Sequence, residues 1–332
     1  MQNQPVRIDE TDEKILRNML QEARTTFTEI AKECNISVGA VRTRFERLKK
    51  TGIITGSIMQ INPKALGYNF VSDIAIETSV NRAKEVMMDL KAKPYWVFGG
   101  STFPKFNIDI FVALRSIEKM IEIHEDLEAN PLIKRVETLI WVEPTGMDHA
   151  ENLVINPVTH RNNANKNHTQ IIPSSNFEAQ TPIDDLDMQI AKILVHNART
   201  PLKQIADQLR VPVKRVFQRY NKLRNCLLTQ STITVDLKKL GYKAMINILI
   251  KASNKREVPR IWSQLLEIPN ILVTIRLIGN YDLIVIGVLE DFQDYFRLSE
   301  KVCKIEGIKK TEIHLREADR SWPENMFAPL LD

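Results

Sequence analysis

The apolar residues of positions 8–62 recur with a helical period in three consecutive segments. A first helix is predicted after Asp9 or Thr11, and its apolar face is formed by Ile15, Leu16, Met19 and Leu20. A second, short helix covers 26–33, and Ser37 is a suitable N-cap for a third helix that runs to about residue 50. After Gly52, residues 53–58 are predicted as a short pair of strands. Three helices and a β wing predict a winged helix-turn-helix module.

Beyond Leu66-Gly67-Tyr68 the pattern changes to strand, helix, strand, strand, helix, strand. The expected strands are 70–78, 95–102, 107–114 and 132–142, and the expected helices lie near 82–91 and 117–128. Two βαβ-type units in about 80 residues predict a ferredoxin-like module, in which two helices cover one face of the sheet. The other face also needs a cover, so we expect these modules to pair, and the same chain offers a partner.

The whole pattern occurs twice, at a nearly constant offset of 175 residues that relates Ile8 to Ile183 and Arg24 to Arg199. The second set of strands is expected near 244–252, 270–278, 282–289 and 308–317. Between the halves, residues 156–182 are rich in Asn, Thr, Ser and Pro and lack hydrophobic periodicity, which predicts a flexible linker. The predicted fold class is therefore α+β: two winged helix-turn-helix modules, each followed by a ferredoxin-like βαββαβ module.

These changes of pattern also predict the domain boundaries. In the first half, the winged helix-turn-helix domain covers 7–62 and the ferredoxin-like domain 63–145, with a linker at 146–182. The second half has a partly degenerate winged helix-turn-helix domain at 183–237, a ferredoxin-like domain at 238–317 and a tail at 318–332. The tail residues Trp322 and Met326-Phe327 are expected either to pack within this chain or to dock on a neighbouring module.

Composition adds little beyond excluding some classes of protein. Of the 332 residues, 43% are hydrophobic and 26% charged, which is typical of globular modules. No stretch approaches the roughly 18–20 apolar residues that span a bilayer, and the N-terminus has no apolar segment typical of a secretory signal. The three cysteines are far apart, which favours reduced thiols in a cytoplasmic protein, with no metal site and no cofactor. A net charge of +5 permits a polyanionic partner without requiring one.

The third predicted helix of each half carries a basic face opposite its apolar stripe. Small residues at the start of the first such helix allow close approach to a DNA groove, and long cations can neutralise phosphates. The DNA-binding candidates of this helix are Ser37, Val38, Ala40, Arg42, Thr43, Arg44 and Arg47. An alternative role for Arg44, retained as Arg219 in the second half, is to brace the module internally.

The equivalent helix of the second half has a different start and a different outer face. Its DNA-binding candidates are Lys214, Arg215, Arg219 and Lys222. Pro212 replaces the capping Ser37, and Phe217 stands where Arg42 was. This module is expected to hold DNA by charge, with a weaker role in recognising bases.

A hairpin loop in the second half is a candidate effector site, formed by Gly279, Asn280, Tyr281 and Asp282. Glycine permits close approach of the backbone, and the carboxylate suits an ammonium group. The alternative is a tight turn selected for its geometry. The counterpart loop 104–107 in the first half has lost the glycine, the phenol and the acid, so it is the poorer candidate.

Together these features resemble the leucine-responsive/asparagine-synthetase regulator (Lrp/AsnC) family. The matching motifs are Ile8-Asp9-x-x-Asp12, Glu29-Ile30-Ala31, Arg44-x-x-Arg47-Leu48, Gly52-Ile53-Ile54-x-Gly56, Leu66-Gly67-Tyr68 and Gly279-x-Tyr281-Asp282. The resemblance implies that the ferredoxin-like module is of the amino-acid-metabolism regulatory (RAM) type, which forms dimers and rings and often binds amino acids near the loop matched here by 279–282. Typical members have one copy, so the usual dimer is expected here as a pseudo-dimer within one chain, with further homo-oligomers.

The resulting functional hypothesis is a sequence-specific transcription regulator of double-stranded DNA, modulated by an amino-acid-like effector and without catalytic residues. One alternative is an effector-independent architectural DNA-binding protein. The other is an enzyme similar to siroheme decarboxylases, which carry His, Tyr and Arg between the second and third strands to handle tetrapyrrole carboxylates. Residues 98–107 contain neither His nor Arg, and the six histidines are not expected to cluster, which argues against the enzyme.

Overall fold

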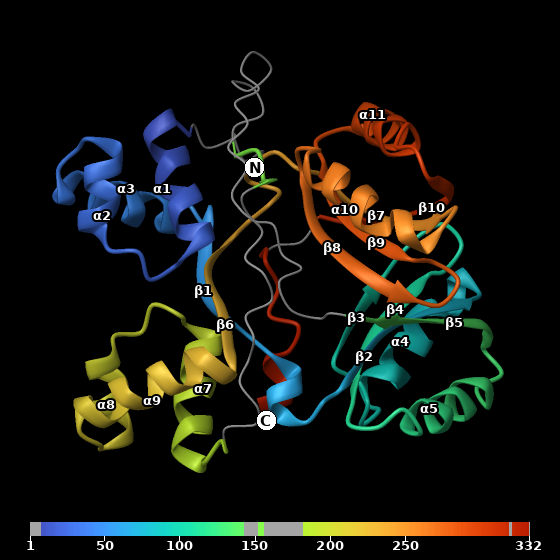
Figure 1. Cartoon of the computed structure of the whole chain (residues 1–332), viewed down its shortest axis with the longest axis horizontal. Helices are drawn as coiled ribbons and strands as arrows, with labels where there is room; N and C mark the ends of the chain where they lie inside the picture. Colours follow the sequence, from blue (N-terminus) through green and yellow to red (C-terminus); the bar gives the residue numbers. More distant parts are fainter. Residues whose placement is uncertain (1–7, 143–151, 156–181, 319–320, 332) are drawn as a thin grey trace. The chain divides into compact units, whose positions relative to one another are not determined.

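The computed structural model describes residues 8–142, 152–155, 182–318 and 321–331 (Figure 1). The chain divides into two compact units, and each unit draws on both halves of the sequence. Unit 1 comprises 1–62, 148–243 and 318–332, and unit 2 comprises 63–147 and 244–317. The duplication therefore places like modules together: unit 1 contains both helical modules, and unit 2 contains both α/β modules.

Unit 1 contains two copies of a three-helix module followed by one strand. The first copy consists of α1 (Glu10–Gln21), α2 (Phe27–Cys34), α3 (Val38–Lys50) and β1 (Ile54–Ile61). The second consists of α7 (Asp185–His196), α8 (Leu202–Leu209), α9 (Val213–Cys226) and β6 (Leu228–Val235). Local side-chain caps start α1 and α7, because Asp9 and Asp184 each accept a hydrogen bond from the third residue of the helix. Ser37 caps α3, whereas α9 starts at Pro212 without a side-chain cap, as predicted.

The wing differs from the prediction. Residues 53–58 do not form a strand pair; β1 is a single strand that pairs antiparallel with β6 of the other half, with Ser57 opposite Ile233. Figure 1 shows this pair beside the two helical modules, coloured blue and yellow. The prediction was wrong because a strand pattern shows that the backbone groups need a partner strand but does not show which strand of the chain provides it.

Two equivalent arginines join the modules of unit 1. The guanidinium of Arg24 donates hydrogen bonds to the carbonyls of Ala198 and Thr200, the latter at 3.1 Å. In return Arg199 donates to the carbonyls of Ala23 and Thr25. Burial, together with the charge of Arg24, lowers the pKa of Arg199. Because each half gives the other the same contact, this interface has the reciprocal character of a two-fold dimer interface within one chain.

Two segments outside these modules also pack into unit 1. In the tail, Trp322 and Phe327 are buried, and the backbone of Trp322 exchanges hydrogen bonds with Val235 at 2.8 and 2.9 Å. The tail also carries a 3-10 helix, η5 (Ala328–Leu331). Of the expected linker 146–182, residues 152–155 are packed, since Leu153 and Ile155 are buried, while 146–151 and 156–181 lie outside the described residues.

Unit 2 contains two ferredoxin-like modules in one sheet of order β10-β7-β9-β8-β5-β2-β4-β3. The first module consists of β2 (Phe70–Thr78), α4 (Ala83–Lys91), β3 (Phe98–Ser101), β4 (Ile108–Leu114), α5 (Lys119–Glu128) and β5 (Ile133–Trp141). The second consists of β7 (Ala244–Ala252), α10 (Val258–Leu266), β8 (Ile271–Ile278), β9 (Leu283–Leu289), α11 (Phe292–Cys303) and β10 (Ile308–Glu317). Unit 2 also contains the short 3-10 helices η1 (Pro63–Leu66), η2 (Val80–Arg82) and η4 (Lys255–Glu257).

The two modules of unit 2 meet at two seams, which confirms the expectation that they pair within the chain. At one seam β5 pairs with β8 through Trp141 and Leu277. At the other, the backbones of Phe103 and Leu315 exchange hydrogen bonds of 3.1 and 2.7 Å. Each module keeps its own apolar core between its half of the sheet and its two helices.

The sheet face opposite the helices contains two buried carboxyl groups. Asp73 on β2 and Asp109 on β4 are diagonal neighbours and are only 2% and 9% exposed. Trp141 donates its indole N–H to Asp73 at 2.9 Å. Burial and the neighbouring Asp109 raise the pKa of Asp73 well above its usual range, and burial raises the pKa of Asp109 to about 7, while Arg316 opposes both shifts.

Candidate functional site

The start of α3 presents small and exposed side chains. The Ser37 hydroxyl accepts the N–H of Ala40 at 3.1 Å, and the Thr43 hydroxyl donates to the carbonyl of Gly39 at 3.0 Å. Val38 is 41% exposed. Arg42 is exposed and has no ion-pair partner among the described residues. This first turn and Arg42 are therefore open to an external partner.

The two other arginines predicted on this face brace the module. Arg44 donates to Asp9 at 2.6 Å and to Asp12 at 2.9 Å, and these hydrogen bonds raise the pKa of Arg44. Arg47 also donates to Asp12, whose carboxylate is fully buried. The structure thus supports the alternative role of Arg44, and it assigns a bracing role to Arg47 that the sequence had not indicated.

The second half repeats this division of its cations. Arg219 pairs with Asp184 at 2.7 Å and Asp187 at 3.1 Å, and Lys222 pairs with Asp187. Lys214 and Arg215 are exposed at the start of α9, without ion pairs in the described part of the chain. In each module, the cations nearest the helix start, Arg42 or Lys214 and Arg215, face solvent. The cations that follow them hold α3 or α9 against the first helix of the same module.

The predicted effector loop is largely engaged within unit 2. Asp282 is buried, pairs with Lys251 at 3.1 Å and accepts the backbone N–H of Ala252 at 3.0 Å. Gly279 has a φ of +145°, and a side chain there would approach the carbonyl of Thr138 to 3.2 Å. Gly279 and Asp282 therefore fit the alternative of a tight turn, because the backbone conformation of Gly279 and the contacts of Asp282 hold the loop in place. Asp282 is thus not free to hold an ammonium group.

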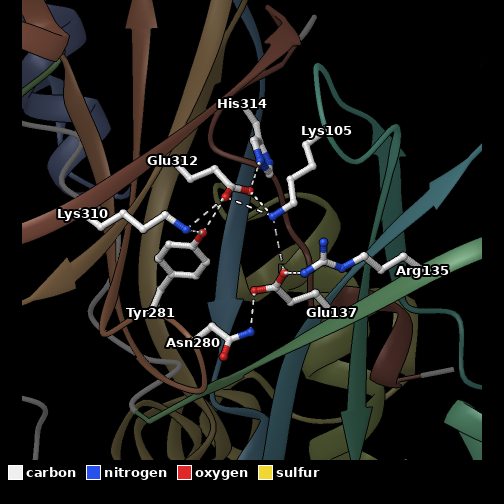
Figure 2. Close-up of polar contacts among 8 residues, drawn as sticks. All are labelled: Lys105, Arg135, Glu137, Asn280, Tyr281, Lys310, Glu312 and His314. Atoms are coloured by element: carbon white, nitrogen blue, oxygen red, sulfur yellow. Dashed lines mark hydrogen bonds and ion pairs between the residues drawn. The ribbon is translucent and has the colours of Figure 1, made fainter.

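Beside the loop lies a group of polar side chains from both modules, which we call the polar cluster (Figure 2). Its members are Lys105, Arg135, Glu137, Asn280, Tyr281, Lys310, Glu312 and His314. Lys105 of the first module binds Glu312 of the second at 2.9 Å and lies 3.8 Å from Glu137. Asn280 of the second module donates to Glu137 of the first at 3.0 Å. Each loop thus reaches the last strand of the other module.

Glu312 is the centre of the polar cluster. It accepts hydrogen bonds from the Tyr281 hydroxyl at 2.6 Å and from Lys105, and its carboxylate lies 3.0 Å from His314 Nε2. Burial opposes ionisation, but the hydrogen bonds from Tyr281, Lys105 and His314 lower the pKa of Glu312 to about 2. Burial and the adjacent carboxylate raise the pKa of Tyr281, so the phenol stays protonated and the glutamate stays charged at neutral pH.

The sequence missed most of the polar cluster. Its acids and outer cations come from β5 and β10, where the 175-residue offset relates Glu137 to Glu312 and Arg135 to Lys310. This offset was the feature of the sequence from which these paired strand residues could have been found. His314 is buried against Glu312, a contact that the sequence did not indicate. Across the described ranges, no three His, Cys, Asp or Glu side chains are grouped as metal ligands, and no helix is long and apolar enough to cross a membrane.

A solved structure that matches along almost the whole chain is that of the siroheme decarboxylase NirDL. It superposes with a TM-score of 0.63 over 97% of this chain and 97% of that chain, at 14% sequence identity. At this identity the likeness concerns the fold alone. It shows that the two chains share a similar fold along almost their whole length.

The relatives in sequence each match less than half of the chain. The transcriptional regulator LrpA of Pyrococcus horikoshii is 46% identical over 84 residues, which are 25% of this chain and 60% of LrpA. A helix-turn-helix-type transcriptional regulator of Pyrococcus furiosus is 32% identical over 136 residues, 40% of this chain and 90% of that protein. The regulatory protein AsnC of Escherichia coli is 30% identical over 144 residues, 42% of this chain and 86% of AsnC.

Family models match three of the four modules. Residues 8–55 match a winged helix-turn-helix DNA-binding model, and 183–224 match an AsnC-type helix-turn-helix domain. Residues 243–316 match the Lrp/AsnC ligand-binding domain, the module that carries Tyr281 and Glu312. With its duplicated helix-turn-helix and ferredoxin-like modules, the chain belongs to the Lrp/AsnC family of transcription regulators.

Proposed function

We propose that one chain binds a specific double-stranded DNA site through α3 and α9, and that an amino-acid-like effector bound at the polar cluster changes this affinity. The observation that carries the proposal is the pairing of two helix-turn-helix modules within unit 1 through β1, β6 and the reciprocal Arg24 and Arg199 contacts. Regulators with this motif place paired recognition helices in successive major grooves. Here a single chain supplies both helices.

The distribution of charge supports DNA as the partner. Arg42 in the first module and Lys214 and Arg215 in the second remain exposed, whereas the neighbouring cations are neutralised by Asp9, Asp12, Asp184 and Asp187. Exposed cations on a helix that enters a groove can bind base edges or phosphates. The DNA-contacting set is therefore narrower than the basic face that the sequence presents.

Replacing Arg42 by alanine is expected to weaken specific DNA binding by roughly 5- to 150-fold if it contacts a base, or to reduce the salt slope by about one if it contacts a phosphate. Arg44→Ala should instead lower the stability of unit 1, because it leaves Asp9 and Asp12 without their shared cation. Fluorescence anisotropy at two salt concentrations, on DNA selected from a genomic library, measures the first effect, and urea unfolding measures the second. Unchanged affinity and salt slope for Arg42→Ala would exclude this face of α3.

The polar cluster supports a zwitterionic effector. Lys310 and Arg135 are 62% and 53% exposed at its edge and can receive a carboxylate, while Glu137 is a buried acceptor suited to an ammonium group and Glu312 is partly buried beside it. Three cations stand against two acids in the polar cluster, so the acids leave a cation available to the carboxylate of a ligand. Because the pKa of Glu312 is about 2, this acceptor stays charged across the neutral range.

Removing the Lys310 side chain is expected to weaken binding of an amino-acid effector by roughly tenfold or more, since a charge-assisted hydrogen bond contributes about 1.5–3 kcal/mol. Isothermal titration with single amino acids, and DNA binding with and without the amino acid that binds, measure this effect. Lys309→Ala is the matched control, because Lys309 is an exposed neighbour on β10 that lies outside the polar cluster. Equal loss in both variants would indicate a general charge effect rather than a site.

The same protein and DNA samples also test the two alternatives, an architectural DNA-binding protein and an enzyme. An amino acid that binds the protein but leaves DNA affinity unchanged would favour an architectural protein. The decarboxylase alternative is favoured by the fold shared with NirDL and by the position of His314 beside Tyr281 and Glu312. We propose that the chain is not an enzyme, so anaerobic incubation with siroheme should leave the mass of the tetrapyrrole unchanged. Loss of carboxyl groups from the tetrapyrrole would overturn this.

A further inference from the structure

The two helices proposed to bind DNA share one exposed apolar position and differ at the next position on the same face. Val38 of α3 and Val213 of α9 are equivalent, and both are about 40% exposed, at 41% and 43%. One turn further along, α3 carries Arg42 and α9 carries Phe217, which is 53% exposed. The outer face of α3 is thus cationic at this point, and that of α9 is apolar and aromatic.

Phe217 does not serve the core of its module. The buried residues of α9 are Val216, Leu223 and Cys226, on the other side of the helix. No aromatic or cation–π partner of the Phe217 ring occurs among the described residues. Because Val213 and Phe217 are four residues apart, their side chains are neighbours and form an exposed apolar strip, and the exposed cation Lys214 lies beside it on the helix surface.

The difference between Arg42 and Phe217 affects which base each helix can recognise in the major groove. Arginine makes two parallel hydrogen bonds to O6 and N7 of guanine, whereas phenylalanine and valine can contact only the C5-methyl group of thymine. The exposed cations Lys214 and Arg215 at the start of the same helix still suit phosphates of the DNA backbone. A helix with this strip can therefore lie in the same groove as α3 but favours a different base.

We propose that the chain recognises two unlike half-sites: α3 a half-site with guanine facing Arg42, and α9 a half-site with thymine facing the strip of Val213 and Phe217. This rests on the proposed function in DNA binding and adds the base preference of each half. Since both helices belong to unit 1 of one chain, the preference also fixes the direction in which the chain lies on its site. A symmetric dimer of identical subunits has no such direction.

The test is selection of binding sites from random double-stranded DNA by the full chain and by its Phe217→Arg variant. The wild type is expected to select a motif with two unlike halves, one containing the guanine and the other the thymine. Phe217→Arg should replace the thymine by guanine and make the two halves alike. Phe217→Leu, which keeps an apolar side chain, should retain the thymine, and it shows whether the fold tolerates a change at this exposed position.

A second measurement isolates the methyl group. Replacing the selected thymine by deoxyuridine removes one methyl and is expected to weaken wild-type binding by about fourfold, as expected for one buried methyl-sized group. The same replacement should leave the affinity of Phe217→Arg unchanged. A wild-type motif with identical halves, or an unlike motif that neither Phe217→Arg nor deoxyuridine affects, would overturn this inference and leave DNA binding intact. If the wild type selects no motif, the proposed function fails, and this inference with it.

Discussion

Asp12→Ala is expected to lower the free energy of unfolding of unit 1 by about 2–4 kcal/mol. The Asp12 carboxylate is fully buried, receives Arg44 at 2.9 Å together with Arg47, and also accepts the backbone N–H of Asp9 in the capping box of α1. Its removal leaves two arginines without their shared acceptor. The cost lies below that of a fully buried pair, because Arg44 and Arg47 are 31% and 42% exposed and water can hydrate them.

Hydrogen exchange followed on peptides from α1 and α3, together with urea unfolding, measures this loss. Glu10→Ala is the matched control, since Glu10 is an exposed acid in the first turn of the same helix. Asp187→Ala tests the equivalent position in the second module, where Arg219 and Lys222 lose their acceptor. If Asp12→Ala unfolds at the same urea concentration as Glu10→Ala, the brace between α1 and α3 does not contribute to stability.

Asp109→Asn is expected to stabilise unit 2 at neutral and higher pH and to remove most of a pH dependence of the wild type. In the unfolded chain Asp109 loses its proton near its ordinary pKa of 3.8, but in the folded protein burial raises this pKa to about 7. The unfolded state therefore binds fewer protons between these values, so stability falls as pH rises from about 4 to 7. At 1.36 kcal/mol for each pKa unit, the fall is on the order of 4 kcal/mol as an upper limit.

Thermal unfolding between pH 4 and 8 measures this slope. The wild type should lose stability steadily from about pH 4 to 7, whereas Asp109→Asn should show a flatter profile, with the remaining slope arising from Asp73. Glu125→Gln, on the exposed face of α5, is the control for removal of one carboxylate and should follow the wild type. A wild-type profile that rises from pH 4 to 7 would show that Asp109 is ionised in the fold.

The features that the sequence predicted correctly depend on contacts between residues close in the chain. The apolar period and the caps at Asp9 and Ser37 act within one or two helical turns, so α1 to α3 and their repeats were predictable. The strands of both ferredoxin-like modules followed from similar local patterns. The duplication was visible because the offset of 175 residues preserves both the motifs and their spacing.

The partners of these elements depend on residues far apart in the chain, and the sequence does not rank such partners. It predicted a strand pair within 53–58, but the backbone groups of β1 are satisfied by β6 of the other half. It placed Arg44 and Arg47 with Arg42 on one basic face, but two of the three pair with Asp9 and Asp12. Nothing in a charge pattern tells a cation that faces solvent from one that faces a carboxylate on another helix.

The candidate effector site likewise combines a loop that the sequence indicated with residues that only long-range packing brings together. The loop 279–282 was found because glycine, an aromatic residue and an acid occur together in sequence, yet Asp282 serves the loop itself. The acids of the polar cluster, Glu137 and Glu312, lie on strands of different modules, and Lys105 links them. The sequence by itself determined the family, the repeat and the secondary structure, because these are encoded locally. Tertiary structure alone decided which charges are neutralised and which remain available to DNA or a ligand, because that depends on long-range packing.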